Sequence, residues 1–352
     1  MQVRTLAIGC LLVLSLLAVR TSAAEATAAS LGPAPRSENG RFTNAIGNLS
    51  HGSVWVRFTF FLRRIAGSFH PRPGAPVRVD NDGALLRDNA GGDLPTVTWI
   101  GHATLLVQMD HVTFLTDPIW SDSPSPVSFA GPDRFVAPGL ALEDLPPIDF
   151  VVISHNHYDH LDLPSLVALA ARNPKTRFLV PLGNAALLLE NGIVRVEEFD
   201  WGESTQHGDV SIHCLPAQHW SKRWINDDLK ALWSSWAITG PKRRMFFAGD
   251  TGYFDGFSRI GEALGPFDLA AVPIGAYEPS KMMAQSHMNP EEALRASLDL
   301  AAKRALGIHF GTFDLTDEPL DEPPRRFLEA AKESPLEPNA AWILQIGETR
   351  AF

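Results

Sequence analysis

The stretch "DFVVISHNHYDH", residues 149–160, joins a strongly apolar run to three histidines and an aspartate. The apolar part has the β-branched and aromatic composition of a buried strand, so the histidines follow directly at a strand end. His155 and His157 point the same way in an extended segment, whereas Asp159 and His160 come after a local bend. Imidazole nitrogens and carboxylate oxygens are ligands that zinc accepts. We therefore predict that this loop offers two ligands to each of two adjacent metal ions.

Three further side chains that follow apolar segments complete the predicted site. His219 follows "VSIHCLP", Asp250 ends "RRMFFAGD" and His309 ends "RALGIH". Metal ligands are held best at strand ends, where the scaffold fixes them. Asp117 in "LTDP" is expected to support a ligating histidine through a hydrogen bond. We assign one metal ion to His155, His157 and His219, the other to Asp159, His160 and His309, and place Asp250 as a bridge between them.

The composition is that of an ordinary globular protein. The chain has 352 residues, of which 45% are hydrophobic and 20% charged, so a sizeable core can form without disulfides. The formal net charge is −10, which argues against nucleic acid as a partner. An acidic chain that carries 12 histidines points instead to imidazole chemistry.

The N-terminus has the pattern of a secretory signal peptide. Arg4 gives a basic start, Leu6 to Val19 are apolar, and small residues around Ala24 form a cleavage zone. The apolar run is short for a membrane span, and an uncleaved anchor is the alternative. We expect residues 1–24 to be a signal peptide and the protein to be exported, either periplasmic or membrane-associated. Cleavage would leave 28 basic against 40 acidic residues, a net charge of −12, and Cys214 without a disulfide partner.

Residues 25–95 are expected to form a flexible leader followed by an amphipathic segment. The small, polar, proline-containing run at 25–40 predicts the leader. In "SVWVRFTFFLRRIAGSF", residues 53–69, apolar side chains recur at helical spacing with three arginines among them. Such a helix either packs on the body of its own domain or makes a peripheral contact with an anionic membrane, and both interpretations stay open.

Residues 96–352 are predicted to form one domain of class α/β. Apolar strand-like runs such as "TLLVQM" and "RFLVP" alternate with helical segments. Asp162 is a natural helix N-cap, and the helix that starts at Asn289 has its own cap and two early glutamates. Trp233 and Trp236 are expected to pack beside a sheet. The mixture favours a single body with two sheets.

The metal motif and its neighbours resemble a known family. His-x-His-x-Asp-His at a strand end is the signature of the metallo-β-lactamase-fold hydrolases, and the resemblance narrows to the N-acyl-phosphatidylethanolamine-hydrolysing phospholipases D. The metal motif alone identifies only the superfamily, whereas "GAYEP", "FDLAAVPIG" and "IHFGTF" together are specific to a much narrower family. The matching segments run in order from Trp99 to Glu318, with "GETR" near the end. They are "WIGHATLLVQMD", "LTDPIWS", "ISHNHYDHLD", "AQHWSKR", "LWSSWAITGP", "RMFFAGDTGY", "GPFDLAAVPIGAYEP", "HMNPEEALR" and "GIHFGTFDLTDEP".

The resemblance implies a fold, a cofactor and an assembly. For residues 96–352 it implies a metallo-β-lactamase-fold hydrolase domain, an αβ/βα four-layer sandwich of two mixed sheets with helices outside. It implies two Zn²⁺ ions, although the ligand types also suit other divalent transition metals. Tyr158 and His287 match residues that contact the phospholipid in that family. The resembling enzymes form dimers, so a homodimer is one implied assembly.

The function implied by the resemblance is a dizinc phosphodiesterase of the phospholipase D type. A glycerophospholipid would be hydrolysed by attack of a metal-bridging hydroxide, which two ions about 3.5–4 Å apart generate at neutral pH. Asp159, Asp250 and His287 are the expected catalytic residues, with His287 also binding substrate or protonating the leaving group. One alternative is a same-fold lactonase or hydrolase of another small ester. Another is a metal-loaded protein that binds lipid without turnover, which the full set of ligand positions weighs against.

Overall fold

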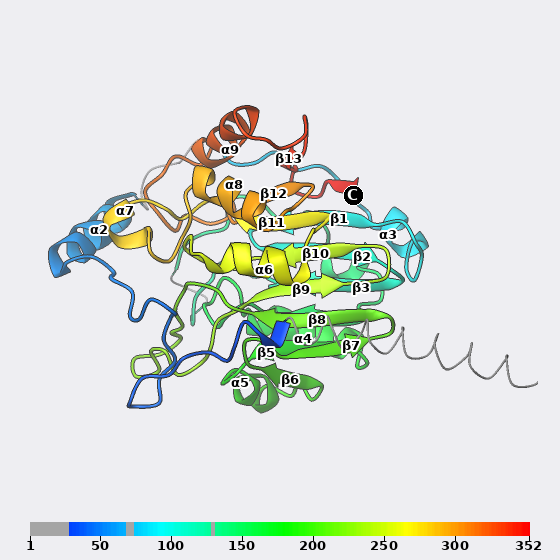
Figure 1. The fold of residues 1–352 in the computed structure, drawn as a ribbon, viewed down its shortest axis with the longest axis horizontal. Coiled ribbons are helices and arrows are strands. Elements are labelled where there is room, and N and C mark those ends of the chain that lie inside the picture. Colours follow the sequence, from blue (N-terminus) through cyan, green and yellow to red (C-terminus); the bar gives the residue numbers. More distant parts are fainter. Residues whose placement is uncertain (1–27, 68–73, 128–130) are drawn as a thin grey trace, which may run out of the picture.

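Two seven-stranded sheets carry the fold of this protein. The computed structural model describes residues 28–67, 74–127 and 131–352. The predicted signal peptide, residues 1–24, lies outside the described residues. Figure 1 shows the strands running through the centre of the molecule, with helices around them.

The first sheet is mixed, with antiparallel pairs at one side and parallel pairs at the other. Its apolar runs form strands where the sequence predicts them. The inner strands are covered by the other sheet on one face and by helices on the other, so their sequences are almost continuously apolar. In spatial order its strands are β14 (Thr349–Ala351), β1 (Thr96–Gly101), β2 (Thr104–Met109), β3 (Val112–Thr116), β4 (Phe150–Val152), β5 (Arg177–Pro181) and β6 (Val196–Phe199).

The second sheet is mixed in the same way. Its parallel half is made of short strands, of which β11 and β12 are fully buried, as expected for a sheet with helices on its outer face. In spatial order its strands are β13 (Ala341–Trp342), β12 (Ala305–Ile308), β11 (Leu269–Pro273), β10 (Arg244–Phe247), β9 (Ser235–Thr239), β8 (Val210–Leu215) and β7 (Ser204–His207).

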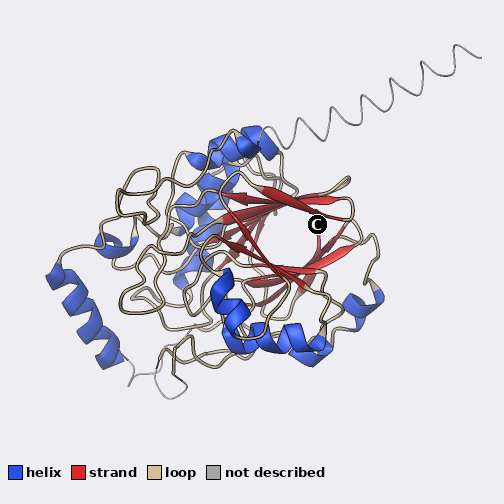
Figure 2. Cartoon of the chain, turned by 90° about the horizontal axis from the view of Figure 1, so that it is seen from below, coloured by secondary structure: helices blue, strands red, loops and turns tan. Residues whose placement is uncertain are grey.

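The two sheets face each other, and the helices lie outside them (Figure 2). This is the predicted four-layer αβ/βα arrangement. Helices α4 (Leu163–Arg172) and α5 (Ala185–Glu190) pack against the first sheet. The second sheet is covered by α6 (Gly256–Leu264), α8 (Pro290–Asp299) and α9 (Glu322–Lys332). The remaining helical segments are α2 (Val54–Gly67), α3 (Ala84–Asp88), α7 (Ser280–Met283) and a 3-10 turn at Leu142–Asp144.

The alternation of side chains along β2 shows how the layers are joined. Leu105 and Val107 belong to the core between the two sheets, whereas Leu106 faces the helix layer. Trp233 and Trp236 are buried in the core between the sheets, as predicted.

The helix caps follow the sequence prediction in one case and differ in the other. At Asn289 the side chain accepts from the backbone N–H of Glu292, whose carboxylate accepts in turn from the Asn289 N–H. Asp162 stands at the N-cap position of α4 but makes no hydrogen bond to the helix backbone. Its carboxylate instead accepts from the Ser165 hydroxyl in the first turn of α4 and from the Ser121 hydroxyl, and the bond to Ser121 ties the start of α4 to the loop after β3.

The segment before α2, residues 28–53, is here called the N-terminal strap. We expected a flexible leader at 25–40, but the described part packs on the body. Ala34 and Phe42 are buried, and the Ala34 N–H donates to Asp200 at 2.9 Å. Asn44 is buried too, and its amide exchanges hydrogen bonds with the backbone of His219 at 2.8 and 3.0 Å. The strap therefore holds the loop that carries a predicted metal ligand.

Helix α2 forms where the periodic apolar pattern predicts it. Val56 and Phe60 are half-buried, whereas Trp55, Phe58 and Phe61 are exposed, so packing on the body of the domain explains only part of the pattern. Among the described residues, no helix is long and apolar enough to cross a membrane.

Replacing Asn44 by alanine tests the role of the strap. The change leaves the buried N–H and C=O of His219 without their partners, and Trp233 loses one of its two acceptors. We expect the free energy of unfolding to fall by about 2–4 kcal/mol, because each unsatisfied buried group costs about 1–3 kcal/mol. Urea denaturation measures it. The matched control is Asn48→Ala at an exposed position of the same strap; equal stabilities of the two variants would contradict this role.

Candidate metal centre

The seven predicted ligands meet at one edge of the molecule, where strands of both sheets end. Within each group of candidate ligands the nitrogen and oxygen atoms lie within 4.8 Å of one another. All of these side chains are buried or nearly so. The loop after β4 supplies His155, His157, Asp159 and His160, and the segments after β8, β10 and β12 supply His219, Asp250 and His309.

The first cluster consists of three imidazoles. Nε2 of His155 lies 2.8 Å from Nδ1 of His157, and Nε2 of His219 lies 3.3 Å from the same atom. The outer nitrogens of two of these rings are engaged elsewhere. Nδ1 of His155 faces the Ser154 hydroxyl at 2.9 Å, and Nδ1 of His219 faces the carbonyl oxygen of Ser286 at 2.9 Å.

These partners decide where the protons sit. A carbonyl oxygen can only accept, so His219 donates from Nδ1 and keeps a lone pair on Nε2. The Ser154 hydroxyl donates to Asp117, so it accepts from Nδ1 of His155, which keeps its lone pair on Nε2. Both lone pairs point at His157. A cation among the three nitrogens satisfies all of them, so the donor set fits a metal ion.

The second cluster combines imidazoles with a carboxylate. Nε2 of His160 lies 3.2 Å from Nε2 of His309 and 3.3 Å from Oδ2 of Asp159. Nδ1 of His160 donates to Asp117 at 2.7 Å, which turns its Nε2 toward the cluster. The predicted support from Asp117 is therefore present as a hydrogen bond, in the carboxylate–histidine arrangement typical of metal sites.

Asp250 lies between the two clusters. Its Oδ2 is 3.3 Å from Nε2 of His160 and 3.8 Å from Nε2 of His219, while its Oδ1 is 3.1 Å from Nε2 of His309. The chain reaches this position through Gly249, whose φ is +59° and where a Cβ atom would collide with Ser154. A carboxylate in this place can bind a cation in each cluster.

The titration behaviour of the two clusters differs. Burial lowers the pKa of His155 and of His219 well below the usual range, and that of His157 to about 4, so these rings are neutral. Burial also opposes charge on His309, but the carboxylates of Asp250 and Asp159 together outweigh it and raise the pKa of His309 to about 9. The first cluster therefore has the neutral imidazoles that a divalent metal requires, whereas a metal ion in the second cluster would have to displace the proton of His309.

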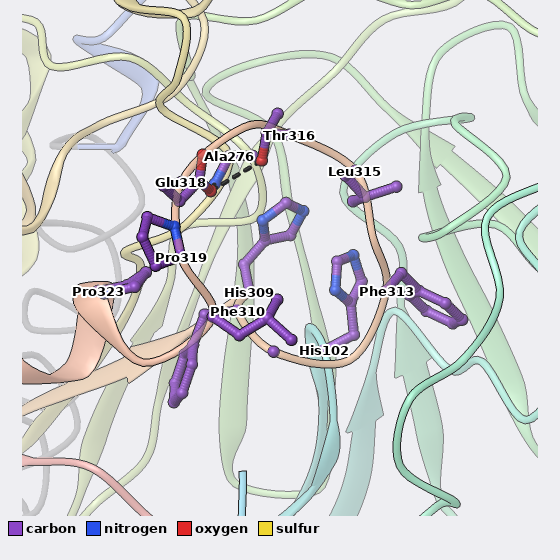
Figure 3. A pocket seen from close by; sticks show the side chains of 12 residues that line it. His102, Ala276, His309, Phe310, Phe313, Leu315, Thr316, Glu318, Pro319 and Pro323 are labelled. Atoms are coloured by element: carbon purple, nitrogen blue, oxygen red, sulfur yellow. Dashed lines mark hydrogen bonds between the residues drawn. The ribbon is translucent and has the colours of Figure 1, made fainter. Parts of the chain in front are cut away.

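His102 joins the second cluster, and sequence reasoning missed it as a site residue. It follows β1 in "WIGH", and its Nε2 lies 2.9 Å from Oδ2 of Asp159. Its backbone is held at φ +53° by hydrogen bonds with Thr312 and His309. Figure 3 shows the rings of His102 and His309 side by side beneath the loop that follows β12. A histidine after a glycine at a strand end was the available signal.

A cavity of about 20 Å³ lies behind these two rings. Its lining includes Thr316 and Glu318, joined by a hydrogen bond of 2.7 Å (Figure 3). Among the described residues, Nδ1 of His102 and Nδ1 of His309 have no hydrogen-bond partner. The cavity is large enough for one water molecule, which can satisfy them.

Of the two residues expected to contact substrate, His287 lies beside the ligand clusters and Tyr158 packs against Arg223. His287 lies beside the clusters, with Nδ1 3.8 Å from Oδ2 of Asp250. The ring of Tyr158 instead lies under the guanidinium of Arg223 at 4.0 Å, and its hydroxyl donates to the Arg223 carbonyl oxygen at 2.8 Å. Arg223 also donates to the backbone of Asn156, so Tyr158 helps to hold the loop after β8 against the loop after β4.

A sequence profile of the Beta-lactamase superfamily domain matches residues 112–310, which is more than half of the chain. The chain belongs to the β-lactamase superfamily. The matched range contains all seven predicted ligands of this chain, whereas His102 and the N-terminal strap lie outside the range. The chain thus has the fold and the family membership of metal-dependent hydrolases.

Two known proteins are similar in sequence to this chain. N-acyl-phosphatidylethanolamine-hydrolyzing phospholipase D 1 of Caenorhabditis elegans is 47% identical over 228 residues, which are 62% of this chain and 64% of that protein. The match thus spans less than two thirds of that relative's length. An uncharacterized protein of Mycobacterium tuberculosis is 43% identical over 266 residues, 74% of this chain and 70% of that protein.

A solved structure shares the fold. The metallo hydrolase Igni18 of the archaeon Ignicoccus hospitalis superposes with a TM-score of 0.55 at 23% identity, covering 73% of this chain and 98% of that one. The agreement confirms the metallo-β-lactamase fold that the motif predicts.

Two replacements of His102 test whether it orients Asp159. The side-chain nitrogen of glutamine reaches the place of Nε2 and can keep the hydrogen bond to Asp159. The shorter side chain of asparagine reaches only the place of Nδ1 and loses that hydrogen bond. We expect His102→Asn to weaken the binding of one metal ion by about 10–100-fold and His102→Gln to stay within a few-fold of the native chain. Calorimetric titration of the metal-free protein with Zn²⁺ measures both affinities.

Asparagine tolerates positive φ better than most residues, so backbone strain does not explain a loss in that variant. A loss in His102→Gln as large as in His102→Asn would contradict the orienting role, because glutamine restores the hydrogen bond but is a poor metal ligand. Thermal unfolding of both variants checks that they fold.

Proposed function

We propose that this protein is a metal-dependent phosphodiesterase of the phospholipase D type that hydrolyses N-acyl-phosphatidylethanolamine or a related glycerophospholipid. The observation that carries the proposal is the pair of ligand clusters with Asp250 between them. The similarity to the C. elegans phospholipase D supports the substrate class.

Two divalent ions, proposed to be Zn²⁺, would be held by the two clusters. Cluster one offers His155, His157 and His219, and cluster two offers Asp159, His160 and His309. When bound, such ions supply charge that neutralises a phosphodiester and makes water nucleophilic at neutral pH. Histidine and carboxylate donors favour zinc among the available divalent metals, and iron and manganese are the next candidates.

An apolar cavity beside the first cluster supports a lipid substrate. The cavity has a volume of about 390 Å³ and is lined by Leu49, Leu229 and Met282 together with Trp220. The Trp220 ring packs edge-on against His157, with ring centroids 4.4 Å apart. Pockets of this size and character bind the apolar parts of small ligands. An acyl chain in this cavity would bring the lipid headgroup next to the clusters.

In the proposed reaction, water adds its oxygen to phosphorus and the bond from phosphorus to the ethanolamine oxygen breaks. The products are phosphatidic acid and an N-acylethanolamine, and one proton of the water ends on the leaving oxygen. Burial lowers the pKa of His287 to about 4, so a neutral ring faces the headgroup. This favours a hydrogen bond from His287 to the substrate over proton donation. Asp159, held by His102, is proposed to orient the reacting groups.

A headgroup-varied panel tests the substrate. We expect the purified protein to release phosphatidic acid from N-acyl-phosphatidylethanolamine faster than from phosphatidylethanolamine. Mass spectrometry of the lipid products measures the release. Lactone opening without any phosphatidic acid would contradict the proposal and favour the small-ester alternative.

Asp250→Asn tests the chemistry. The amide cannot bridge two cations as a carboxylate does, so we expect kcat/KM to fall at least about 100-fold while the chain stays folded. The matched control is Asp209→Asn in the exposed turn between β7 and β8, which is expected to keep full activity. Unchanged product release by Asp250→Asn would contradict the two-metal mechanism.

Export to the periplasm and a homodimeric assembly stay predictions of the sequence and of the resemblance. The contact of Tyr158 with substrate also stays a prediction. Its hydroxyl is already engaged with Arg223, so we propose that any such contact is made by the edge of its ring.

A further inference from the structure

Helix α2 presents an apolar face that the rest of the described chain leaves open. The side chains recur at i, i+1, i+4, i+7 and i+8, so they lie along one side of the helix. They are Val54, Trp55, Phe58, Phe61 and Leu62, with exposed fractions of 74%, 70%, 49%, 60% and 48%. Soluble domains rarely expose so many large apolar side chains together, and such a patch marks a contact surface.

The apolar side chains are exposed although the helix is held in place, because contacts near both of its ends attach it to the body of the domain. Before α2, the Ser50 N–H donates to the Gln285 side chain at 2.5 Å. Near its end, Arg63 donates to Asp317 at 2.9 Å through Nε, and its Nη2 lies 2.7 Å from the same oxygen. Figure 1 shows α2 beside α7 at the edge of the molecule. The body therefore holds the helix on one side and leaves the apolar side to another molecule.

The charge of α2 favours an anionic lipid surface over a second copy of this chain as the molecule that covers this face. The segment "VWVRFTFFLRRIAG" has no acidic residue and three arginines, of which Arg63 is paired with Asp317, whereas the whole chain carries a net charge of −10. A symmetric pairing of two α2 faces would bring the arginines of both copies together, which disfavours self-association. Aromatic and arginine side chains on one helix are instead typical of helices that lie in the headgroup region of an anionic bilayer.

The cavity beside the first cluster opens next to this helix. Arg57 of α2 lines it together with Trp220 and Leu229, which flank a loop of the opposite wall. That loop exposes two more large apolar side chains, Trp224 at 65% and Ile225 at 72%. Apolar side chains therefore stand on both sides of the cavity, and the Trp220 ring in its wall packs against His157.

We propose that α2 is a docking element that inserts its apolar face into an anionic lipid surface, with Trp224 and Ile225 as a second contact. Docking sets the mouth of the cavity against the bilayer, so a lipid passes from the surface to the ligand clusters without crossing water. The docking step does not require hydrolysis, so its failure and the failure of the proposed function are distinguishable.

Sedimentation with lipid vesicles tests the docking step without turnover. The native chain is expected to bind vesicles that contain phosphatidylglycerol more tightly than vesicles of phosphatidylcholine alone, and added salt is expected to weaken the binding. The double variant Phe58→Ser with Phe61→Ser is expected to bind at least about tenfold more weakly. The control pair Leu189→Ser with Val194→Ser removes apolar side chains that are 52% and 78% exposed elsewhere, and is expected to bind like the native chain.

Brominated phosphatidylglycerol locates the contact. It is expected to quench part of the tryptophan fluorescence of the native chain. Trp55→Phe is expected to reduce that quenching, and the remainder is expected to come from Trp224. Equal vesicle binding by the Phe58/Phe61 variant, or equal quenching in Trp55→Phe, would overturn the proposal. So would a dimer in sedimentation velocity that the double variant loses, because the face would then join two copies of this chain.

Discussion

The structure depends on one electrostatic constraint. Imidazole lone pairs and carboxylates converge in a buried site where strands of both sheets end, and their mutual repulsion has to be offset. His155 and His219 donate hydrogen bonds from Nδ1 to the Ser154 hydroxyl and the Ser286 carbonyl oxygen, so their inner Nε2 atoms carry lone pairs and can only accept. Such a group of acceptors is costly in a water-poor interior unless a cation joins it. The rest of the fold serves to hold these groups against one another.

Both sheets are needed to meet that constraint. The loop after β4 gives four of the seven candidate ligands, and three strand ends of the second sheet give one each. Asp117 after β3 and the Ser286 carbonyl before α8 fix which nitrogen faces inward. The fold common to the superfamily therefore holds the ligands, whereas the strap and α2 lie outside the profile match and line the cavity beside the first cluster.

The sequence predicts the parts of this arrangement that are local. The spacing of His155, His157, Asp159 and His160 shows directly that one loop holds several donors, and the apolar runs before His219, Asp250 and His309 mark them as strand ends. His102 was missed because its role comes from a positive φ and from contacts with Asp159 and His309, which are distant in the sequence.

Long-range packing also explains the other differences. The strap has the composition of a leader, yet Phe42 and Asn44 find partners near Leu229 and His219 that no local pattern indicates. The periodicity of α2 predicts a helix correctly, but only the folded chain shows that its apolar face is left open.

The most direct test of the central claim is anomalous X-ray scattering from crystals of the protein loaded with zinc, measured at the zinc edge. Two peaks per chain are predicted, one among His155, His157 and His219 and one among Asp159, His160 and His309, with Asp250 between them. A single peak, or peaks away from these side chains, would contradict the account.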